Sequence, residues 1–274
     1  MSARDPHRYV NELDAAALER LIARLESRAK DEVFTRLFDK YASRLLAEAP
    51  ARVLEIGSGT GAMMRSLARR PEFTGTALGI EQSPAFVEAA RRLADQEGVG
   101  DRVEFRVGDA HRLDVADQSF DAVIINTVIS HVSDTTTVLR EMARVVRKGG
   151  TVAIFDGDYA SMTYAHPDFE LGRRMDAALV AATFNNPRIM RELPGLLPQL
   201  GLQIREAWGD AVSEIGSAGF FKSFAETYVP YVIDAGLVPA EVVRAWHADE
   251  LRAMENGTFF GACNYYTYLA RRIS

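Results

Sequence analysis

The stretch Val53-Leu54-Glu55-Ile56-Gly57-Ser58-Gly59-Thr60-Gly61 decides the fold of this chain. It is an apolar run that stops in glycines at alternate positions, and a helical pattern follows from Ala62 to Arg70. The order strand, tight loop and helix is the junction at which open α/β sheets bind nucleotide-like ligands. Glycine suits such a loop because it adopts positive φ at little cost and lets the backbone touch a ligand.

Glu55 distinguishes between two kinds of ligand for this loop. Gly57, Gly59 and Ala62 satisfy a relaxed dinucleotide fingerprint, which would indicate a NAD(P)-dependent oxidoreductase. A carboxylate two residues before the first glycine would repel a pyrophosphate and attract an ammonium group. S-adenosylmethionine (SAM) carries an amino group, a sulfonium and a ribose but no phosphate, so Glu55 favours SAM over a dinucleotide.

Length and composition suit an α/β domain with an embellishment. The chain has 274 residues, of which 47% are apolar, and a formal net charge of −6. Cys263 is the single cysteine, which excludes an internal disulfide and a cysteine-based metal cluster and favours a reducing compartment. No extended basic patch indicates nucleic acid, and no apolar run approaches membrane-spanning length. We expect a cytoplasmic protein that holds no metal and contacts neither nucleic acid nor membrane; a homodimer is compatible with its sequence.

Apolar periodicity predicts strand and helix in alternation, repeated five times, which gives a parallel sheet with right-handed crossovers. After the first strand, the expected strands cover 76–80, 102–107, 120–127 and 151–156. Two amphipathic helices, over 11–29 and 33–46, precede the sheet. After Gly157 the pattern predicts helices over 168–184 and 187–200, a strand over 202–212, helices over 218–235 and 239–255, and a strand over 258–269.

Candidate ligand residues follow three further strands at their carboxyl ends. Glu81 ends the second strand about twenty residues beyond the glycine loop, where doubly wound folds place the carboxylate that binds ribose hydroxyls. Asp109 follows the third strand, where it would accept the adenine amine or act as a turn residue. Asn126 and the loop to His131 follow the fourth strand. Carboxyl ends of parallel strands meet at one edge, so these residues are expected at one site.

Together these motifs resemble those of the class I SAM-dependent methyltransferases, especially the small-molecule group of quinone and natural-product biosynthesis. The resemblance covers about residues 50–158 and includes Arg147-Lys148-Gly149-Gly150, read as the end of a helix before the fifth strand. It implies an α/β fold with a Rossmann-like doubly wound seven-stranded sheet of order 3-2-1-4-5-7-6, strand 7 being antiparallel.

The resemblance also implies a set of cofactor-binding positions: Glu55, Gly57, Ser58, Gly59, Gly61, Glu81, Gln82, Asp109, Ala110 and Asn126. Glu55 would hold the methionine ammonium, and Glu81 would bind both ribose hydroxyls. Asp109 and the Ala110 amide would read the adenine edge, and Asn126 would lie near the methionyl group.

His131 is the candidate general base. Methyl transfer is an in-line displacement that requires a nucleophile about 3–3.5 Å from the methyl carbon. His131 follows the fourth strand at the appropriate edge, and histidine titrates near neutral pH. The alternative is a histidine packed under the cofactor or bonded to a loop carbonyl. His166 is a further candidate base, His111 is expected beside the adenine pocket, and Asp156 is a candidate to orient a substrate.

Aromatic residues of the later segments indicate the substrate. They recur at helical spacing, so they pack a lid on the sheet, line an apolar pocket, or do both. The candidate substrate residues are Tyr9, Tyr159, Tyr164, Phe221 and Tyr228. We therefore expect methyl transfer to an apolar or aromatic small molecule. A SAM-binding fold without methyl transfer, such as a cyclase or a binding protein, stays open as the alternative.

The expected organisation is a single methyltransferase domain over residues 1–274. It divides into an N-terminal helical cap (1–49), a SAM-binding core (50–158), and helical lid or substrate-binding segments (159–200 and 213–257). No internal repeat or low-complexity linker separates these parts.

Overall fold

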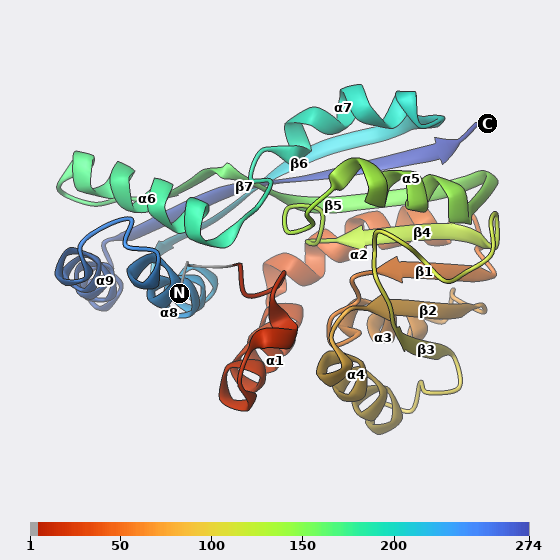
Figure 1. The fold of residues 1–274 in the computed structure, drawn as a ribbon, viewed down its shortest axis with the longest axis horizontal. Helices are drawn as coiled ribbons and strands as arrows, with labels where there is room; N and C mark the ends of the chain where they lie inside the picture. Colours follow the sequence, from red (N-terminus) through yellow and green to blue (C-terminus); the bar gives the residue numbers. More distant parts are fainter. Residues whose placement is uncertain (1–4, 274) are drawn as a thin grey trace.

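Seven strands form one mixed sheet in the computed structural model, which describes residues 5–273. They are β1 (Arg52–Ile56), β2 (Thr76–Glu81), β3 (Val103–Val107), β4 (Phe120–Asn126), β5 (Val146–Tyr164), β6 (Leu202–Gly216) and β7 (Phe259–Arg272). Strands β1 to β5 pair in parallel, and β7 is antiparallel to both of its neighbours. The order β3-β2-β1-β4-β5-β7-β6 confirms the predicted fold (Figure 1).

The helices begin where the sequence offers caps. They are η1 (Val10–Glu12), α1 (Ala15–Lys30), α2 (Glu32–Leu46), α3 (Ala62–Ala68), α4 (Pro84–Gln96), α5 (Thr135–Val145), α6 (Phe169–Thr183), α7 (Ile189–Gln199), α8 (Phe220–Asp234) and α9 (Ala240–Glu255). Ser83, Asp134 and Asp168 each accept a hydrogen bond from a first-turn amide of the helix that follows. Within the described ranges, every helix is too short or too polar to span a bilayer.

The central strands are buried on both faces because their apolar residues alternate between two cores. Val53 and Ile124 pack with α2, α3 and α4 on one face, whereas Leu54 and Ile125 pack with α5 and α7 on the other. The continuous apolar runs of β1 and β4 follow from this double burial. Because β1, β2 and β4 pair in parallel, their carboxyl ends meet at one edge of the sheet. Helix α1 lies near this edge (Figure 1).

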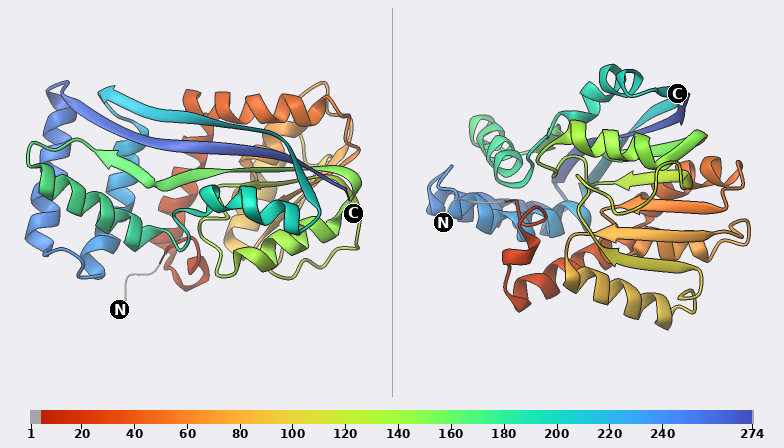
Figure 2. Two further views of the ribbon diagram at one scale, coloured as in Figure 1. Left: turned by 90° about the horizontal axis from the view of Figure 1, so that it is seen from above. Right: turned by 45° about the vertical axis from the view of Figure 1, so that its right-hand side comes forward.

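The segments predicted as a helical lid, called the lid below, are built on the extended ends of β5, β6 and β7. These strands continue beyond the rest of the sheet, and α6, α8 and α9 pack on the extension (Figures 1 and 2). The prediction that the fifth strand ends at Asp156 was wrong. Pairing with β7 resumes past an irregularity, with Thr163 opposite Ala262 and Tyr164 opposite Gly261, so β5 carries the chain into the lid.

The other end of β5 also differs from its prediction. The segment 147–150 was expected to end the preceding helix, but α5 ends at Val145 and β5 begins at Val146. Of the predicted N-terminal cap, residues 1–4 lie outside the described residues. The remainder forms η1, α1 and α2, and α1 packs against α2, α3 and α4.

Candidate active site

A cavity of about 550 Å³ lies at the carboxyl edge of the sheet. Its volume is within the usual range of small-molecule sites. The glycine loop, the ends of β2 and β4, helix α1 and the lid all contribute to its walls. The predicted cofactor residues in its lining are Glu55, Gly57, Ser58, Gly59, Glu81, Gln82, Asp109, Ala110 and Asn126.

Gly61 is the predicted cofactor residue that the structure does not bring to the cavity lining. Its φ is 74°, and a Cβ at this position would lie 2.3 Å from Cζ of Phe105. The third glycine therefore allows the start of α3 to pack closely against β3.

Glu55 presents an unpartnered acidic group to the cavity. Its side chain is buried, and Oε2 has no hydrogen-bond partner within the described part of the chain. Burial and the nearby Glu81 raise the pKa of Glu55 well above its ordinary value. A buried carboxylate without a donor is unfavourable, so an ammonium group of a ligand would supply what the site lacks. The methionine ammonium of SAM fits this requirement.

Glu81 holds the glycine loop and still faces the cavity. Its Oε2 accepts a hydrogen bond from the amide of Gly59 at 3.0 Å, and Oε1 accepts one from the amide of Ser83 at 2.9 Å. Burial raises the pKa of Glu81, while these backbone bonds oppose the rise. The adjacent Gln82 turns toward the N-terminal segment, where Nε2 donates to the carbonyl of His7 at 2.7 Å.

Asp109 and His111 form a pair at the adenine end of the predicted site. Asp109 Oδ1 accepts from the amide of His111 at 2.9 Å and lies 2.7 Å from its Nδ1. Partial burial opposes ionisation, but the bonds from His111 keep the pKa of Asp109 below its ordinary value. His111 also lines the cavity, so the structure brings both side chains to its wall.

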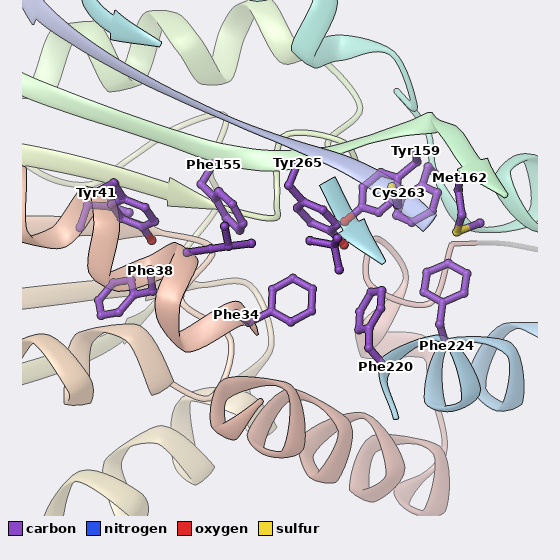
Figure 3. Close-up of a cluster of buried hydrophobic side chains, with 14 of the residues drawn as sticks. Phe34, Phe38, Tyr41, Phe155, Tyr159, Met162, Phe220, Phe224, Cys263 and Tyr265 are labelled. Atoms are coloured by element: carbon purple, nitrogen blue, oxygen red, sulfur yellow. The ribbon is translucent and has the colours of Figure 1, made fainter. Parts of the chain in front are cut away.

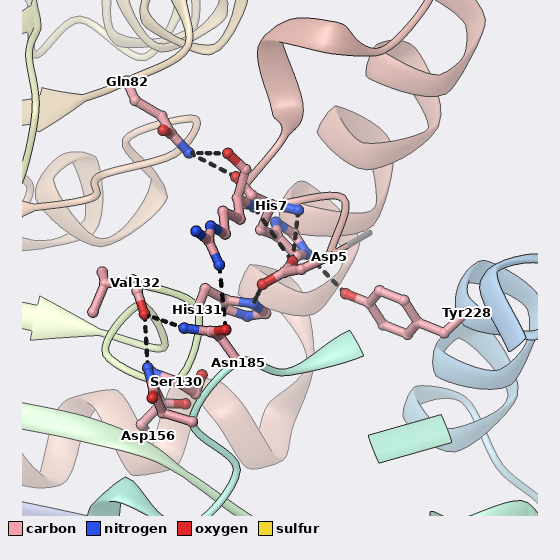
Figure 4. Close-up of polar contacts among 11 residues, drawn as sticks. Asp5, His7, Gln82, Ser130, His131, Val132, Asp156, Asn185 and Tyr228 are labelled. Carbon is pink, nitrogen blue, oxygen red and sulfur yellow. Dashed lines mark hydrogen bonds and ion pairs between the residues drawn. The ribbon is translucent and has the colours of Figure 1, made fainter. Parts of the chain in front are cut away.

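His131 lies in the wall of the cavity and pairs with an acid from the N-terminal segment. Its Nδ1 is 2.7 Å from Oδ2 of Asp5, and the two side chains are 11% and 8% exposed (Figure 4). Burial alone would lower the pKa of His131, but the carboxylate of Asp5 outweighs burial and raises it. Within residues 5–273, Nε2 forms no hydrogen bond, so it is the nitrogen available to a ligand.

His7 connects this pair to the lid. Its Nε2 lies 2.7 Å from the hydroxyl of Tyr228, and its amide donates to Asp5 at 2.9 Å. Burial and the neighbouring charge of His131 lower the pKa of His7 to about 3, so His7 is neutral at physiological pH. Sequence reasoning missed Asp5 and His7, because no motif or periodicity connects them with a loop more than a hundred residues away.

Asp156 and His166, two further candidates from the sequence, do not line the cavity. Asp156 is fully buried, and it accepts hydrogen bonds from the amides of Ser130 at 3.1 Å and Gly157 at 2.8 Å. It therefore fixes the loop that carries His131 and does not line the cavity. His166 pairs with Asp249 in the lid at 3.4 Å, also away from the lining.

Aromatic side chains form much of the cavity wall, and Figure 3 shows several of them in the buried cluster to which they belong. The lining contains Phe34, Phe38, Phe155, Tyr159, Phe184, Phe220, Phe224, Tyr228 and Tyr265. The rings of Tyr159 and Phe184 stack with centroids 3.5 Å apart. Tyr9 also lines the cavity, so three of the predicted substrate residues, including Tyr159 and Tyr228, are brought to it.

The structure does not bring the other two, Tyr164 and Phe221, to the cavity. The Tyr164 hydroxyl donates to the Phe221 carbonyl at 3.0 Å, and both rings are buried in the lid. Helix α8 buries aromatic residues on two sides. Phe220, Phe224 and Tyr228, spaced by four residues, line the cavity, whereas Phe221 packs toward β7.

Comparisons with known proteins agree with this geometry. Residues 54–154 match the family model described as a methyltransferase domain. The phosphatidylethanolamine N-methyltransferase of Cereibacter sphaeroides is 36% identical over 146 residues, which are 50% of this chain and 70% of that enzyme. The methyltransferase GfsG of Streptomyces halstedii is 40% identical over 126 residues, which are 46% of this chain and 44% of that protein. The chain thus matches less than half the length of GfsG.

Solved structures extend the likeness of fold beyond the sequence match. The [4+2]-cyclase SpnF is 20% identical, with a TM-score of 0.57 over 86% of this chain and 80% of that chain. The similar structures include geranyl diphosphate methyltransferases solved as complexes with S-adenosylhomocysteine or with SAM. The chain belongs to the SAM-dependent methyltransferases. Its cofactor is SAM, and its relatives are mostly methyltransferases of small molecules.

Proposed function

We propose that this chain transfers the methyl group of SAM to an apolar or aromatic small molecule, with His131 as the general base. The observation that carries the proposal is the continuity of the cavity. One space joins the unpartnered carboxylate of Glu55, the free Nε2 side of His131 and the aromatic wall of the lid. Cofactor, base and acceptor can therefore meet without a rearrangement of the sheet.

The acids along the sheet edge account for cofactor binding. Glu55 would pair with the methionine ammonium, and Glu81 would accept hydrogen bonds from the ribose hydroxyls. Asp109 would accept from the adenine amine, and Asn126, which donates to Tyr41 at 2.9 Å, would border the methionyl group. When bound, SAM supplies an electrophilic methyl group on a good leaving group, so the protein has to position the acceptor and receive its proton.

His131 receives that proton at Nε2, because Nδ1 is engaged by Asp5. Asp5 is a positioning residue: it fixes the ring orientation and stabilises the protonated form of His131 as the proton arrives. The stacked rings of Tyr159 and Phe184 cover the space beside this histidine, where Phe184 lies 5.1 Å from the imidazole centroid. This wall excludes water from the reacting atoms.

The test uses purified chain, SAM labelled on its methyl group, and a panel of aromatic and apolar alcohols, amines and acidic carbon compounds. Label is expected in at least one acceptor. His131→Asn is expected to lower the transfer rate by about 100-fold or more, as for a lost general base, with S-adenosylhomocysteine affinity retained. His166→Asn serves as the matched control, because His166 lies outside the cavity lining.

Two other results would point to the alternatives. Cofactor binding without labelled product across the whole panel would favour a SAM-binding protein without methyl transfer, such as a cyclase. Tighter binding of NAD(P) than of SAM in the same preparation would favour an oxidoreductase and overturn the assignment of Glu55.

A further inference from the structure

The lining of the cavity carries charges of both signs. Among the described residues of the lining, the acids are Glu55, Glu81 and Asp109, and all three are predicted cofactor residues. Helix α1 contributes Arg24 and Arg28, one turn apart, and the N-terminal segment contributes Arg8. Arg24 and Arg28 are not among the predicted cofactor residues, and a neutral hydrocarbon acceptor would leave their charges without a partner.

Arg24 lies against the aromatic side of the lid. Its guanidinium carbon is 5.9, 5.4 and 5.1 Å from the ring centroids of Phe220, Phe224 and Tyr228. Its Nη1 donates to the hydroxyl of Ser223 at 2.9 Å. Contacts of this kind orient a guanidinium without neutralising it, so its remaining N–H groups can serve a ligand.

Arg28 lines the same cavity. Its guanidinium carbon is 4.6 Å from the centroid of Phe34. Burial raises the pKa of both Tyr159 and Tyr265, and the charge of Arg28 opposes the rise in each. These tyrosines come from β5 and β7, so the charge acts on side chains across the cavity from α1.

Neither arginine has a counter-ion among the described residues. Arg24 and Arg28 are half-buried, and neither forms an ion pair with any residue in the range 5–273. Two neighbouring cations among aromatic rings are unfavourable unless an anion joins them. Guanidinium groups bind carboxylates and phosphates through paired hydrogen bonds, which matches such a role.

We propose that the methyl acceptor carries an acidic group, a carboxylate or a phosphate, that Arg24 and Arg28 bind while its apolar body lies among the aromatic side chains. This inference rests on the proposed function, because it names the class of acceptor for the same cavity. The carboxylate of SAM itself is the other source of an anion near α1, and the experiment separates the two sources.

The experiment is calorimetric binding in the presence of saturating S-adenosylhomocysteine, which supplies the cofactor carboxylate in every sample. The probes are 2-naphthoate, 2-naphthyl phosphate and the neutral 2-naphthamide. At least one anion is expected to bind about 10-fold or more tightly than the amide, as for charge-assisted hydrogen bonds. Arg24→Gln and Arg28→Gln should each reduce this preference, and the corresponding lysine variants should keep part of it.

Arg20→Gln is the matched control, since Arg20 lies on α1 one turn before Arg24 but is exposed and outside the lining. Thermal melting of each variant without ligand shows whether it is folded. Equal affinity for anions and amide, or no binding of either anion, would overturn the proposal. So would a loss of S-adenosylhomocysteine affinity as large as the loss of anion affinity in the glutamine variants. Because the readout is binding, failure of methyl transfer alone would count against the proposed function and not against the anion site.

Discussion

Replacing Asp5 with asparagine should shift the pH dependence of methyl transfer. Asp5 and His131 form a charge-assisted contact of 2.7 Å between side chains that are 8% and 11% exposed. Such a contact stabilises the charged histidine by about 1.5–3 kcal/mol. One pKa unit corresponds to about 1.36 kcal/mol, so Asp5→Asn should lower the pKa of His131 by roughly 1–2 units.

The sign follows from the role of His131 as a base. Only the deprotonated imidazole accepts a proton, so the acid limb of kcat/KM lies at the pKa of His131 in the free enzyme. Asp5 raises that pKa, and its loss should move the limb to lower pH while lowering the plateau rate. The assay is kcat/KM for label transfer from SAM across the pH range. Glu19→Gln, an exposed change of equal charge on α1, is the control. A limb that stays in place, or moves to higher pH, would refute the pairing of Asp5 with a catalytic base.

Two further predictions concern stability. Gly61→Ala should lower the free energy of unfolding by about 2–5 kcal/mol, from positive φ and overpacking on Phe105; Gly98→Ala, with φ of 69° and open space, should lose only about 1–2 kcal/mol. Equal losses in urea denaturation would refute the packing role of Gly61. Burial and the charges of Asp176 and Asp249 raise the pKa of Glu250 from 4.5 to about 8. The folded chain therefore holds this proton more tightly than the unfolded chain, and the free energy of unfolding should fall as the pH rises from 4.5 to about 8. Glu250→Gln should flatten the corresponding decline of Tm with pH. Glu241→Gln, at an exposed position, should leave the decline as it is in the parent chain. An unchanged slope of Tm against pH in Glu250→Gln would contradict the assignment.

The sheet and its cofactor edge could be predicted because their signals are local. Glu55 and Glu81 end neighbouring parallel strands, so their convergence follows from topology once the strands are recognised. Caps such as Ser83 and Asp134 fix helix starts within a few residues. The length of β5 was missed because it depends on pairing with β7, about a hundred residues away, and strand propensity does not report a partner.

The substrate end could not be predicted in the same way. Asp5 reaches His131 through a tertiary contact that leaves no spacing signature. Arg24 and Arg28 stand on an amphipathic helix, where charged residues ordinarily face solvent, and only the position of the lid shows that these two face a cavity. The aromatic stripe of α8 predicted burial correctly, but it could not separate Phe221, which packs the lid, from Phe224, which lines the cavity.

The central claim, that an acidic sheet edge binds the cationic methionine group of the cofactor, is tested most directly by calorimetry of S-adenosylhomocysteine with Glu55→Gln. The substitution keeps the shape of the side chain and removes its charge. Loss of one charge-assisted contact to the ammonium, about 1.5–3 kcal/mol, should weaken binding by roughly 10- to 150-fold. Because burial and Glu81 raise the pKa of Glu55, affinity in the parent chain should also increase with pH, and the variant should lack that increase. An unchanged dissociation constant in Glu55→Gln would contradict the account.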